Sequence, residues 1–387
     1  IVMMIPYSRQ NVTKEDIKEV NKVLKSKFLT QGPTVNLFEK KIAKLVNAKF
    51  GIATNSATSA LHVACLALGL SKNDYLWTTA ISFVASANCG LYCNAKVNFI
   101  DIDINTFNIS IAELEKKLIK AKKNKTLPKI LVPVHLAGNP TDQKKIFALS
   151  KKYGFKIIED ASHSLGAFYK NEPVGSCKWS DIAVFSFHPV KIITTGEGGM
   201  AVTNNKILAE KMKIFSEHGI TKHKKNFINK ADGGWYYEQQ VLGYNYRMSD
   251  IHAALGINQS KRLKSDNKKR NKLAEVYKKE LKNLPIKFQE IPNDNISSYH
   301  LFIILLDDKI KKNKHKKLFK VLREKNILVN IHYIPIYRHP YHNKKININS
   351  FPNSEKYYHS AISIPLFPQL NALQQKEIIR IIRAVLI

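Results

Sequence analysis

Three residues with chemically useful side chains lie at or just after the ends of apolar segments. Asp160 ends FKIIED, and Ser186 lies near the end of AVFSFHP, just before Lys191 and the glycine-rich TTGEGG. Ligand sites in open α/β sheets lie at the carboxyl ends of the strands, so these side chains are candidates for one site. A lysine held there is partly desolvated, which lowers its pKa and frees its amine as a nucleophile.

Besides the acid and the lysine, a separate stretch, TNSATSALHVACLAL, combines a strand end, a turn of small residues and a helix. The first amides of such a helix suit a phosphate; Thr58 can add a hydroxyl, and Ala57 leaves the turn open to close approach. Pyridoxal phosphate (PLP) chemistry requires a lysine for an imine, an acid beside the pyridine nitrogen and a phosphate cradle. Taken singly, the three features also fit a surface lysine, a strand-end cap and an ordinary helix N-terminus.

The elements that would position these residues alternate along the chain. Thr13 is a candidate cap of a first helix, TKEDIKEVNKVL, with Ile17, Val20 and Leu24 along one face. Short apolar segments then alternate with helical patterns, which favours a mostly parallel sheet covered by helices. The expected strands are GIAT, LWTT, VNFIDI, ILVPV, FKIIED and IAVFSF, with helices expected from Thr58 and Phe83.

The pattern changes after IHAALGINQSKRL, where a long charged helix follows. The remainder reads as a smaller α+β unit, with HLFIILL and ILVNIHYIP as strands and KLFKVLREKN and QQKEIIRIIRAVL as helices. We therefore predict a large domain over residues 13–260 and a small domain over residues 261–387. Residues 1–12 are expected to pack at the substrate site.

The composition is that of a packed globular protein, with 44% hydrophobic and 24% charged residues among 387. The net charge of +32 could indicate an anionic partner, but the lysines are dispersed in pairs, which favours a solvated surface. The run from Lys309 to Lys317 is the densest group of basic residues.

The four cysteines lack zinc spacing, so no metal is expected. Without a signal sequence or a long apolar run, the sequence predicts a cytoplasmic protein that binds neither membrane nor nucleic acid.

Six stretches, in this order, resemble the DegT/DnrJ/EryC1/StrS sugar aminotransferase family of fold type I PLP enzymes. They are TNSATSALH, ISFVASAN, VHLAGNPTD, EDASHSLGA, FSFHPVKIITTGEGG and LGYNYRMSDIHAALG. The resemblance runs from about Ile5 to the C-terminus and implies an α/β fold with a large PLP-binding domain. FHPVKIITTGEGG is among the most specific signatures of the family.

The resemblance also implies roles for single residues. Lys191 would carry PLP as an imine and later move the proton, while Asp160 would keep the pyridine nitrogen protonated. The remaining cofactor contacts would come from Ala57, Thr58, Phe83, His163, Ser186 and Asn245. His163 stands where many relatives have glutamine facing the 3′ oxygen of PLP, and Phe83 would stack on the ring, although by itself it reads as a core aromatic.

Asn245 corresponds to a family residue that reaches the cofactor phosphate of the neighbouring subunit, which implies a homodimer with shared sites. Substrate contacts are expected from Tyr7, from Lys27, Phe28, Leu29 and Thr30, and from His332, Tyr333, Ile334 and Pro335. Each of these could equally be a surface or packing residue, and Arg247 could bind an anion or tie its helix down.

The combination of NSATSAL with a Ser-His pair after the acid resembles the branch of the family that acts in pseudaminic acid biosynthesis. The implied reaction moves an amino group from L-glutamate to the C4 ketone of a UDP-linked 2-acetamido-2,6-dideoxy-4-keto hexose. Another UDP-, dTDP- or GDP-linked 4-keto sugar is the alternative substrate. A dehydratase of the family would have histidine at Lys191, a PLP-binding regulator would need a DNA-binding module, and intact Lys191, Asp160 and Ser186 argue against an inactive binding protein.

Overall fold

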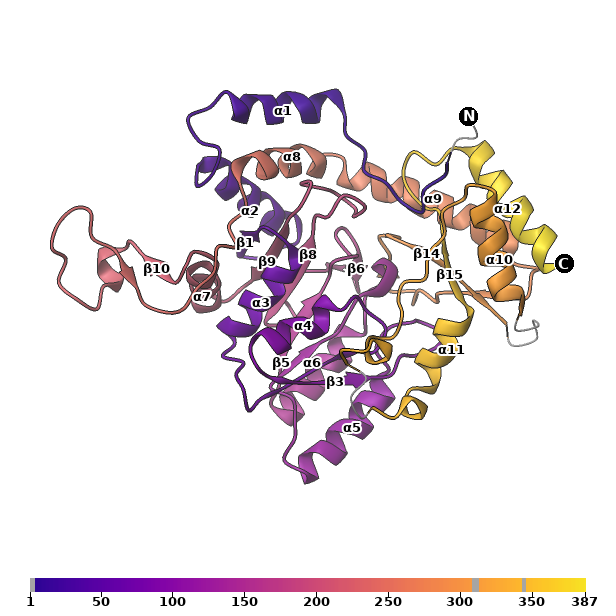
Figure 1. Ribbon diagram of the computed structural model, residues 1–387, viewed down its shortest axis with the longest axis horizontal. Helices are drawn as coiled ribbons and strands as arrows, with labels where there is room; N and C mark the ends of the chain where they lie inside the picture. Colours follow the sequence, from indigo (N-terminus) through magenta and orange to yellow (C-terminus); the bar gives the residue numbers. More distant parts are fainter. Residues whose placement is uncertain (1–3, 308–312, 343–345) are drawn as a thin grey trace.

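The computed structural model describes residues 4–307, 313–342 and 346–387, and its centre is a seven-stranded sheet (Figure 1). The strand order is β1-β9-β8-β5-β4-β2-β3. All of these strands except β9 point the same way, so the sheet is mostly parallel, as predicted. The strands are β1 (Phe50–Thr54), β2 (Tyr75–Thr79), β3 (Lys96–Ile100), β4 (Ile130–Val132), β5 (Lys156–Asp160), β8 (Ile182–Ser186) and β9 (Gly199–Thr203).

Helices cover both faces of this sheet because successive strand residues point to opposite sides. Ile52 and Val184 pack with α3 (Ala57–Ala67), α4 (Ala85–Tyr92) and α7 (Lys206–Ser216) on one face. Ala53 and Phe185 pack on the other face with α2 (Pro33–Leu45) and α8 (Asp250–Ser260), where α5 (Ile111–Lys123) and α6 (Gln143–Tyr153) cover the far strands. The buried layers hold the strand ends, and hence the candidate site residues, in fixed positions.

The first helix, α1 (Lys14–Leu24), lies along α8 (Figure 1). Thr13 and Asp16 form the expected capping box at its start. The apolar face is not buried within this chain, however: Ile17 and Leu24 are 53% and 51% exposed, whereas Asp16 is fully buried. Polar groups of α8 and of the chain after it pair with Asp16, so specific hydrogen bonds rather than the apolar stripe dock this helix.

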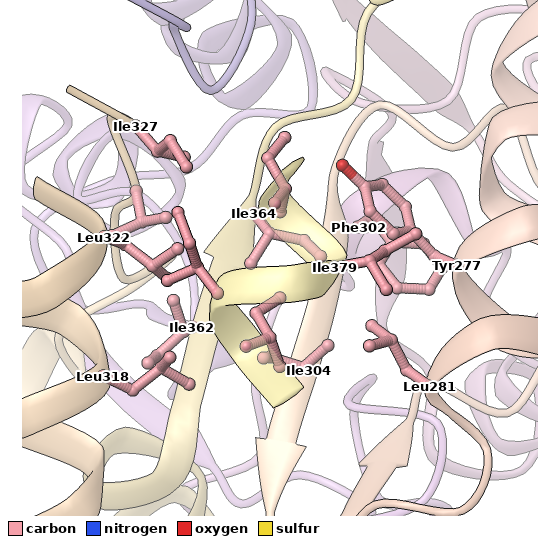
Figure 2. Close-up of a cluster of buried hydrophobic side chains, with 14 of the residues drawn as sticks. Tyr277, Leu281, Phe302, Ile304, Leu318, Leu322, Ile327, Ile362, Ile364 and Ile379 are labelled. Carbon is pink, nitrogen blue, oxygen red and sulfur yellow. The ribbon is translucent and has the colours of Figure 1, made fainter. Parts of the chain in front are cut away.

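A second sheet, with strand order β12-β14-β15, forms beyond α8. Its strands are β12 (Ile286–Phe288), β14 (Phe302–Leu306) and β15 (Ala361–Ile364), and it packs with α9 (Leu263–Leu281), α10 (Asn313–Glu324), α11 (Pro352–Ser360) and α12 (Ala372–Leu386). Figure 2 shows side chains of α9, α10, α12, β14 and β15 meeting in one apolar cluster. Among the described residues, every buried member of that cluster except Ile5 comes from residue 274 or later, and Leu273 packs against it. The division into domains at residue 260 stays a prediction.

The predicted strand ILVNIHYIP is wrong. Residues 327–335 make only isolated bridges, Ile5 to Ile327 and Asn330 to Ser363, and the chain then turns toward the cavity described below. Pro335, which has no amide hydrogen, is unsuited to an interior strand position. The other predicted strands and helices are confirmed, whereas β9, β12 and β15 were not predicted.

The remaining elements are short. They are β6 (Phe168–Tyr169), β7 (Glu172–Pro173), β10 (Ile220–Thr221), β11 (Glu238–Gln239), β13 (Asn295–Ile296) and the 3₁₀ turns η1 (Leu136–Gly138), η2 (Lys224–Asn226), η3 (Ile336–Arg338) and η4 (Ile348–Ser350). β10 and β11 pair at the base of a long hairpin that projects from the molecule, at the end opposite α12 (Figure 1). None of the helices in the described part of the chain is both long and apolar enough to cross a membrane.

Candidate active site

A cavity of about 740 Å³ opens where several strands of the large sheet end. The chain just after β1, β2, β5 and β8 contributes one side of its wall, as expected for an open α/β sheet. The opposite side comes from the C-terminal part of the chain, through His300, Asn330, His332 and Tyr333. The candidate chemistry therefore lies between the large sheet and the smaller unit.

Lys191 lies in this cavity, in the loop after β8. Burial lowers the pKa of its amine to about 8, against the negative charge of Asp160, which raises it. Among the described residues no hydrogen bond or ion pair holds its Nζ, while its backbone amide donates to the carbonyl of His188 at 2.9 Å. The loop is thus fixed and the amine is left free to react, which suits a nucleophilic lysine.

Asp160 ends β5 and is only 5% exposed. Its Oδ2 accepts a hydrogen bond from Ser86 Oγ at 2.6 Å, and its Oδ1 accepts one from the Ser162 amide at 3.2 Å. Ser86 in turn lies 2.7 Å from Ser82 Oγ, so a chain of hydroxyls at the start of α4 orients the carboxylate. A carboxylate oriented in this way suits a partner for the ring nitrogen of PLP.

The first turn of α3 forms another wall of the cavity. Ser56 caps the helix, accepting from the Ser59 amide at 3.1 Å, whereas the amides of Ala57 and Thr58 have no partner among the described residues. A Cβ on Gly199 of β9 would lie 2.5 Å from the Ala57 nitrogen, so only glycine lets β9 approach this turn. Free amides at a helix N-terminus, beside the hydroxyls of Thr58 and Ser186, fit the phosphate of PLP.

His163 is buried in the cavity wall and its proton position follows from its partners. Its Nδ1 accepts from the Ala137 amide at 3.2 Å, so Nε2 carries the hydrogen and faces the hydroxyl of Tyr333, also at 3.2 Å. Burial, with the charges of Lys191 and His332, holds the pKa of His163 well below its ordinary value. His163 is therefore a neutral hydrogen-bond donor at the cavity.

The C-terminal part of the wall is held by buried polar contacts. The carbonyl of His300 accepts from Arg270 of α9 at 3.3 Å, and the His300 ring lies 4.4 Å from that of His163. His332 Nδ1 is 2.9 Å from Ser363 Oγ, and burial beside Lys191 lowers its pKa to about 3. Uncharged histidines thus surround the lysine, which avoids adding positive charge next to its amine.

The cavity collects most, but not all, of the predicted site residues. It includes ten of them: Tyr7, Ala57, Thr58, Phe83, Asp160, His163, Ser186, Lys191, His332 and Tyr333. The other seven lie outside its wall: Lys27, Phe28, Leu29, Thr30, Asn245, Ile334 and Pro335. Residues 27–30 lie on the exposed loop after α1, and the roles of all these residues stay predictions.

Asn245 lies next to the cavity, because its carbonyl accepts from the side chain of Asn55, a wall residue, at 3.4 Å. Arg247 lines a different cavity of about 440 Å³, beside Lys213 and Glu217 of the α7 region. No hydrogen bond to its guanidinium is found in the described part of the chain. The basic run from Lys309 to Lys317 lies partly outside the described residues.

Sequence reasoning missed several residues of the site. Ser82 and Ser86 were not predicted, although their spacing of four in SFVAS places them on one side of a helix start. His300 had no local signal, because it reaches the cavity through the arrangement of the smaller unit. Among the described residues no group of histidine, cysteine and acidic side chains is placed to hold a metal ion.

Comparisons with known proteins agree with this geometry. The DegT/DnrJ/EryC1/StrS aminotransferase family model matches residues 10–383. The UDP-4-amino-4,6-dideoxy-N-acetyl-beta-L-altrosamine transaminase of Campylobacter jejuni is 40% identical over 96% of this chain and 95% of its own. The Bacillus subtilis spore coat polysaccharide biosynthesis protein SpsC is 34% identical over 98% and 96%. Helicobacter pylori PseC, an aminotransferase involved in the biosynthesis of pseudoaminic acid, superposes with a TM-score of 0.90 at 33% identity, over 99% of both chains.

Proposed function

This chain belongs to the DegT/DnrJ/EryC1/StrS aminotransferase family, and we propose that it aminates a UDP-linked sugar of the pseudaminic acid pathway. The reaction moves the amino group of L-glutamate to the C4 ketone of a UDP-linked 2-acetamido-2,6-dideoxy-4-keto hexose. The observation that carries the proposal is the placement of Lys191, Asp160 and the first turn of α3 around one cavity. The named activities of the C. jejuni and H. pylori relatives support the choice of sugar.

Enzymes of this family use PLP, and the residues of the cavity fit it. When bound, PLP takes up the electrons released at the carbon that gains or loses the amino group. Lys191 would hold its aldehyde carbon, Asp160 would hold the proton of its ring nitrogen, and Ala57, Thr58 and Ser186 would bind its phosphate. Phe83 and His163 would contact the ring and its 3′ oxygen.

The amine of Lys191 is also suited to accept and return a proton. With a pKa of about 8, about one molecule in ten carries it neutral at pH 7, against about one in three thousand for an ordinary lysine. Burial holds the pKa values of His163 and His332 low, so these histidines stay neutral and do not compete with Lys191 as proton acceptors. Proton movement in the cavity is thereby left to Lys191 Nζ.

The substrate would enter from the side formed by Tyr7, His332 and Tyr333. Ser8, next to Tyr7, donates from its hydroxyl to the carbonyl of Val190 at 3.1 Å, which ties the N-terminal segment to the loop of Lys191. The Tyr7 ring lies 5.0 Å from that of His332. These contacts support substrate roles for Tyr7 and for the segment from His332 to Pro335.

We further propose a homodimer in which each subunit completes the site of the other. The hairpin between β10 and β11 projects from the chain (Figure 1). Three large apolar side chains on it and at its base, Ile228, Trp235 and Leu242, are 77–79% exposed. Such a surface is typical of a protein contact. Asn245 at the base of the hairpin, and residues 27–30 on the exposed loop, would then serve the neighbouring cavity.

A cytoplasmic location is part of the proposal. The four cysteines are free thiols, which suits a reducing compartment. The experiment that tests the function is incubation of the PLP-loaded protein with L-glutamate and a panel of UDP-, dTDP- and GDP-linked 4-keto sugars. Amination of the UDP-linked 2-acetamido-2,6-dideoxy sugar alone is expected, and product from only a dTDP sugar would make the pseudaminic assignment wrong.

A further inference from the structure

The hydroxyl of Tyr333 has a partner for its oxygen but none for its hydrogen. Its oxygen lies 3.2 Å from Nε2 of His163. Nδ1 of His163 accepts from the Ala137 amide at 3.2 Å, so Nε2 carries the proton and the Tyr333 oxygen is the acceptor. Among the described residues no group accepts the hydrogen of this hydroxyl. Tyr333 therefore offers one O–H donor whose oxygen is already fixed in place.

The surroundings of Tyr333 hold this donor at the cavity. The side chain lines the cavity on the side opposite the strand ends. Its ring centroid lies 6.0 Å from that of Phe83 and 6.1 Å from that of His163, whose ring is nearly parallel to it. The carbonyl of the preceding residue, His332, accepts from the Tyr357 hydroxyl at 2.6 Å, which fixes the backbone at this point. The direction of the Tyr333 side chain is thus set by packing and by hydrogen bonds.

The Tyr333 hydroxyl also keeps its proton. Burial raises the pKa of Tyr333, and the neighbouring Tyr7 and Asp160 raise it further. Such a group acts near neutral pH as a neutral hydrogen-bond donor and leaves proton transfer to Lys191. The Tyr7 hydroxyl also lies in the cavity wall, but no described residue accepts from it or donates to it, so its direction is not fixed.

Amination of a ketone needs a donor at one particular atom. When nitrogen takes the place of the ketone oxygen, the electrons of the C=O double bond move onto that oxygen. The oxygen then leaves as water, with two hydrogens that come from the incoming amine. Negative charge therefore develops on the oxygen while the C–N bond forms, and a fixed donor directed at such an oxygen is typically worth about 10²–10³ in rate.

We propose that the Tyr333 hydroxyl donates a hydrogen bond to the ketone oxygen of the substrate and that His163 positions this hydroxyl. The inference rests on the proposed aminotransferase reaction. Asp160 and the first turn of α3, which would hold PLP, lie on the strand-end side of the cavity, so the substrate is left the side that Tyr333 lines. The 2-oxo acid formed from glutamate has its ketone oxygen at the equivalent atom, so the same donor serves both substrates.

The test loads the protein with pyridoxamine phosphate, mixes it rapidly with 2-oxoglutarate or the UDP-linked keto sugar, and follows the return of visible absorbance. Tyr333→Phe should lower the maximal rate about 100-fold with both ketones, because the donor acts on charge that develops in the transition state. The half-saturating ketone concentration, the PLP affinity and the spectrum of the PLP form should stay at wild-type values. A maximal rate within about threefold of wild type would overturn the proposal, and a changed spectrum would instead place the hydroxyl on the cofactor.

Two further variants separate a role in the reaction from a role in packing. Tyr337 is a matched control, because its buried hydroxyl lies outside the cavity wall and donates to Glu355 at 2.7 Å. Tyr337→Phe should keep both maximal rates within about twofold of wild type, since no reacting atom loses a donor. His163→Leu should slow the wild-type protein at least about 5-fold more than it slows Tyr333→Phe, because the two side chains act together. Equal slowing in both backgrounds would contradict the positioning role of His163.

The two ketones distinguish failure of this inference from failure of the proposed function. If the wild-type protein reacts with 2-oxoglutarate but with no keto sugar, the sugar assignment is wrong and the 2-oxoglutarate rates still test Tyr333. If it reacts with neither ketone, both proposals are wrong. If Tyr333→Phe slows the reaction of the sugar alone, Tyr333 is a sugar contact and the role proposed here is overturned.

Discussion

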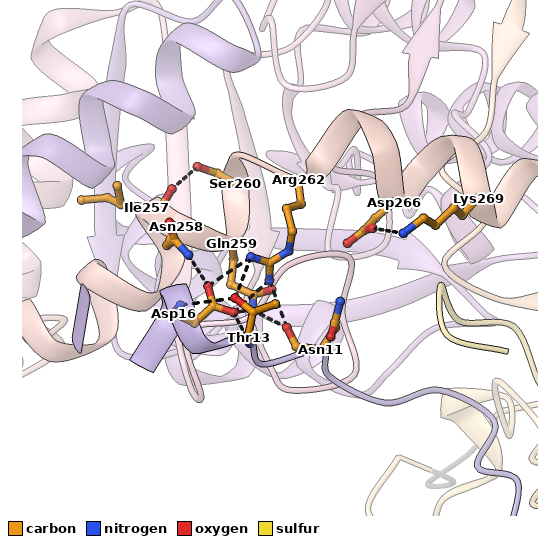
Figure 3. Close-up of polar contacts among 10 residues, drawn as sticks. All are labelled: Asn11, Thr13, Asp16, Ile257, Asn258, Gln259, Ser260, Arg262, Asp266 and Lys269. Atoms are coloured by element: carbon orange, nitrogen blue, oxygen red, sulfur yellow. Dashed lines mark hydrogen bonds and ion pairs between the residues drawn. The ribbon is translucent and has the colours of Figure 1, made fainter. Parts of the chain in front are cut away.

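Asp16→Ala should destabilise the protein strongly, although Asp16 lies in a helix that the apolar pattern would dock through other residues. The carboxylate is fully buried and accepts hydrogen bonds from Asn258 at 2.7 Å, Gln259 at 2.8 Å and Arg262 at 2.9 Å (Figure 3). It also accepts from the Thr13 amide at 2.8 Å as part of the helix cap. Removing one member of a buried charged pair costs about 3–5 kcal/mol, and a lost cap about 1 kcal/mol.

Because these contributions overlap, we expect the free energy of unfolding to fall by about 3–5 kcal/mol in total. The assay is urea-induced unfolding of the variant beside Glu19→Ala, whose exposed pair with Lys22 should be worth less than about 0.5 kcal/mol. A loss below about 1 kcal/mol for Asp16→Ala would refute the reasoning. A loss within that range would show that buried polar contacts, rather than Ile17 and Leu24, hold α1.

The pH dependence gives a second check on the same residue. Burial raises the pKa of Asp16, but hydrogen bonds from Arg262, Thr13 and Asn258 outweigh it and leave the pKa below its ordinary value. A carboxyl group with a depressed folded-state pKa contributes stability above its unfolded pKa of about 3.9, and loses that contribution as the pH falls through its folded pKa. The difference between wild type and Asp16→Ala should therefore shrink below about pH 4, and an unchanged difference there would contradict the ion pair.

Three further predictions concern the site. Ser86→Ala removes the 2.6 Å hydrogen bond to Asp160 and should weaken PLP binding about 10-fold in a spectroscopic titration, whereas unchanged affinity would exclude the orienting role. Gly199→Ala places a Cβ 2.5 Å from a backbone nitrogen of α3 and should lower both thermal stability and PLP affinity; wild-type values for both would contradict the close approach. Inactive Lys191→Ala and Asn245→Ala subunits, when mixed, should regain about a quarter of wild-type activity, because half the dimers contain one intact site; no recovery would argue against shared sites.

The sequence predicted the large sheet well because the positions of its strands follow from local patterns. Apolar segments ending at Asp160 and Ser186 give two neighbouring parallel strands, whose carboxyl ends must meet at one edge. Lys191 was found for the same reason, since it follows one of these strands directly. The family motifs then assigned roles that spacing alone left open.

The rest of the site depends on contacts that no local pattern encodes. His300 reaches the cavity because Arg270 of α9 holds the carbonyls around it, which requires the smaller unit to be in place. The segment after Ile327 has strand-like composition, yet its backbone makes isolated bridges and its aromatic residues turn into the cavity. The burial of Asp16 likewise depends on partners more than 240 residues away. Such tertiary contacts override local propensity.

Borohydride reduction of the PLP-loaded protein, followed by peptide mass spectrometry, tests the central claim most directly. The wild-type protein should absorb in the visible range, and reduction should fix one phosphopyridoxyl group on the peptide that contains Lys191. Lys191→Ala should give no fixed group while retaining its fold by circular dichroism. A group fixed on another lysine, or a wild-type protein that stays colourless after addition of PLP, would contradict the assignment of Lys191.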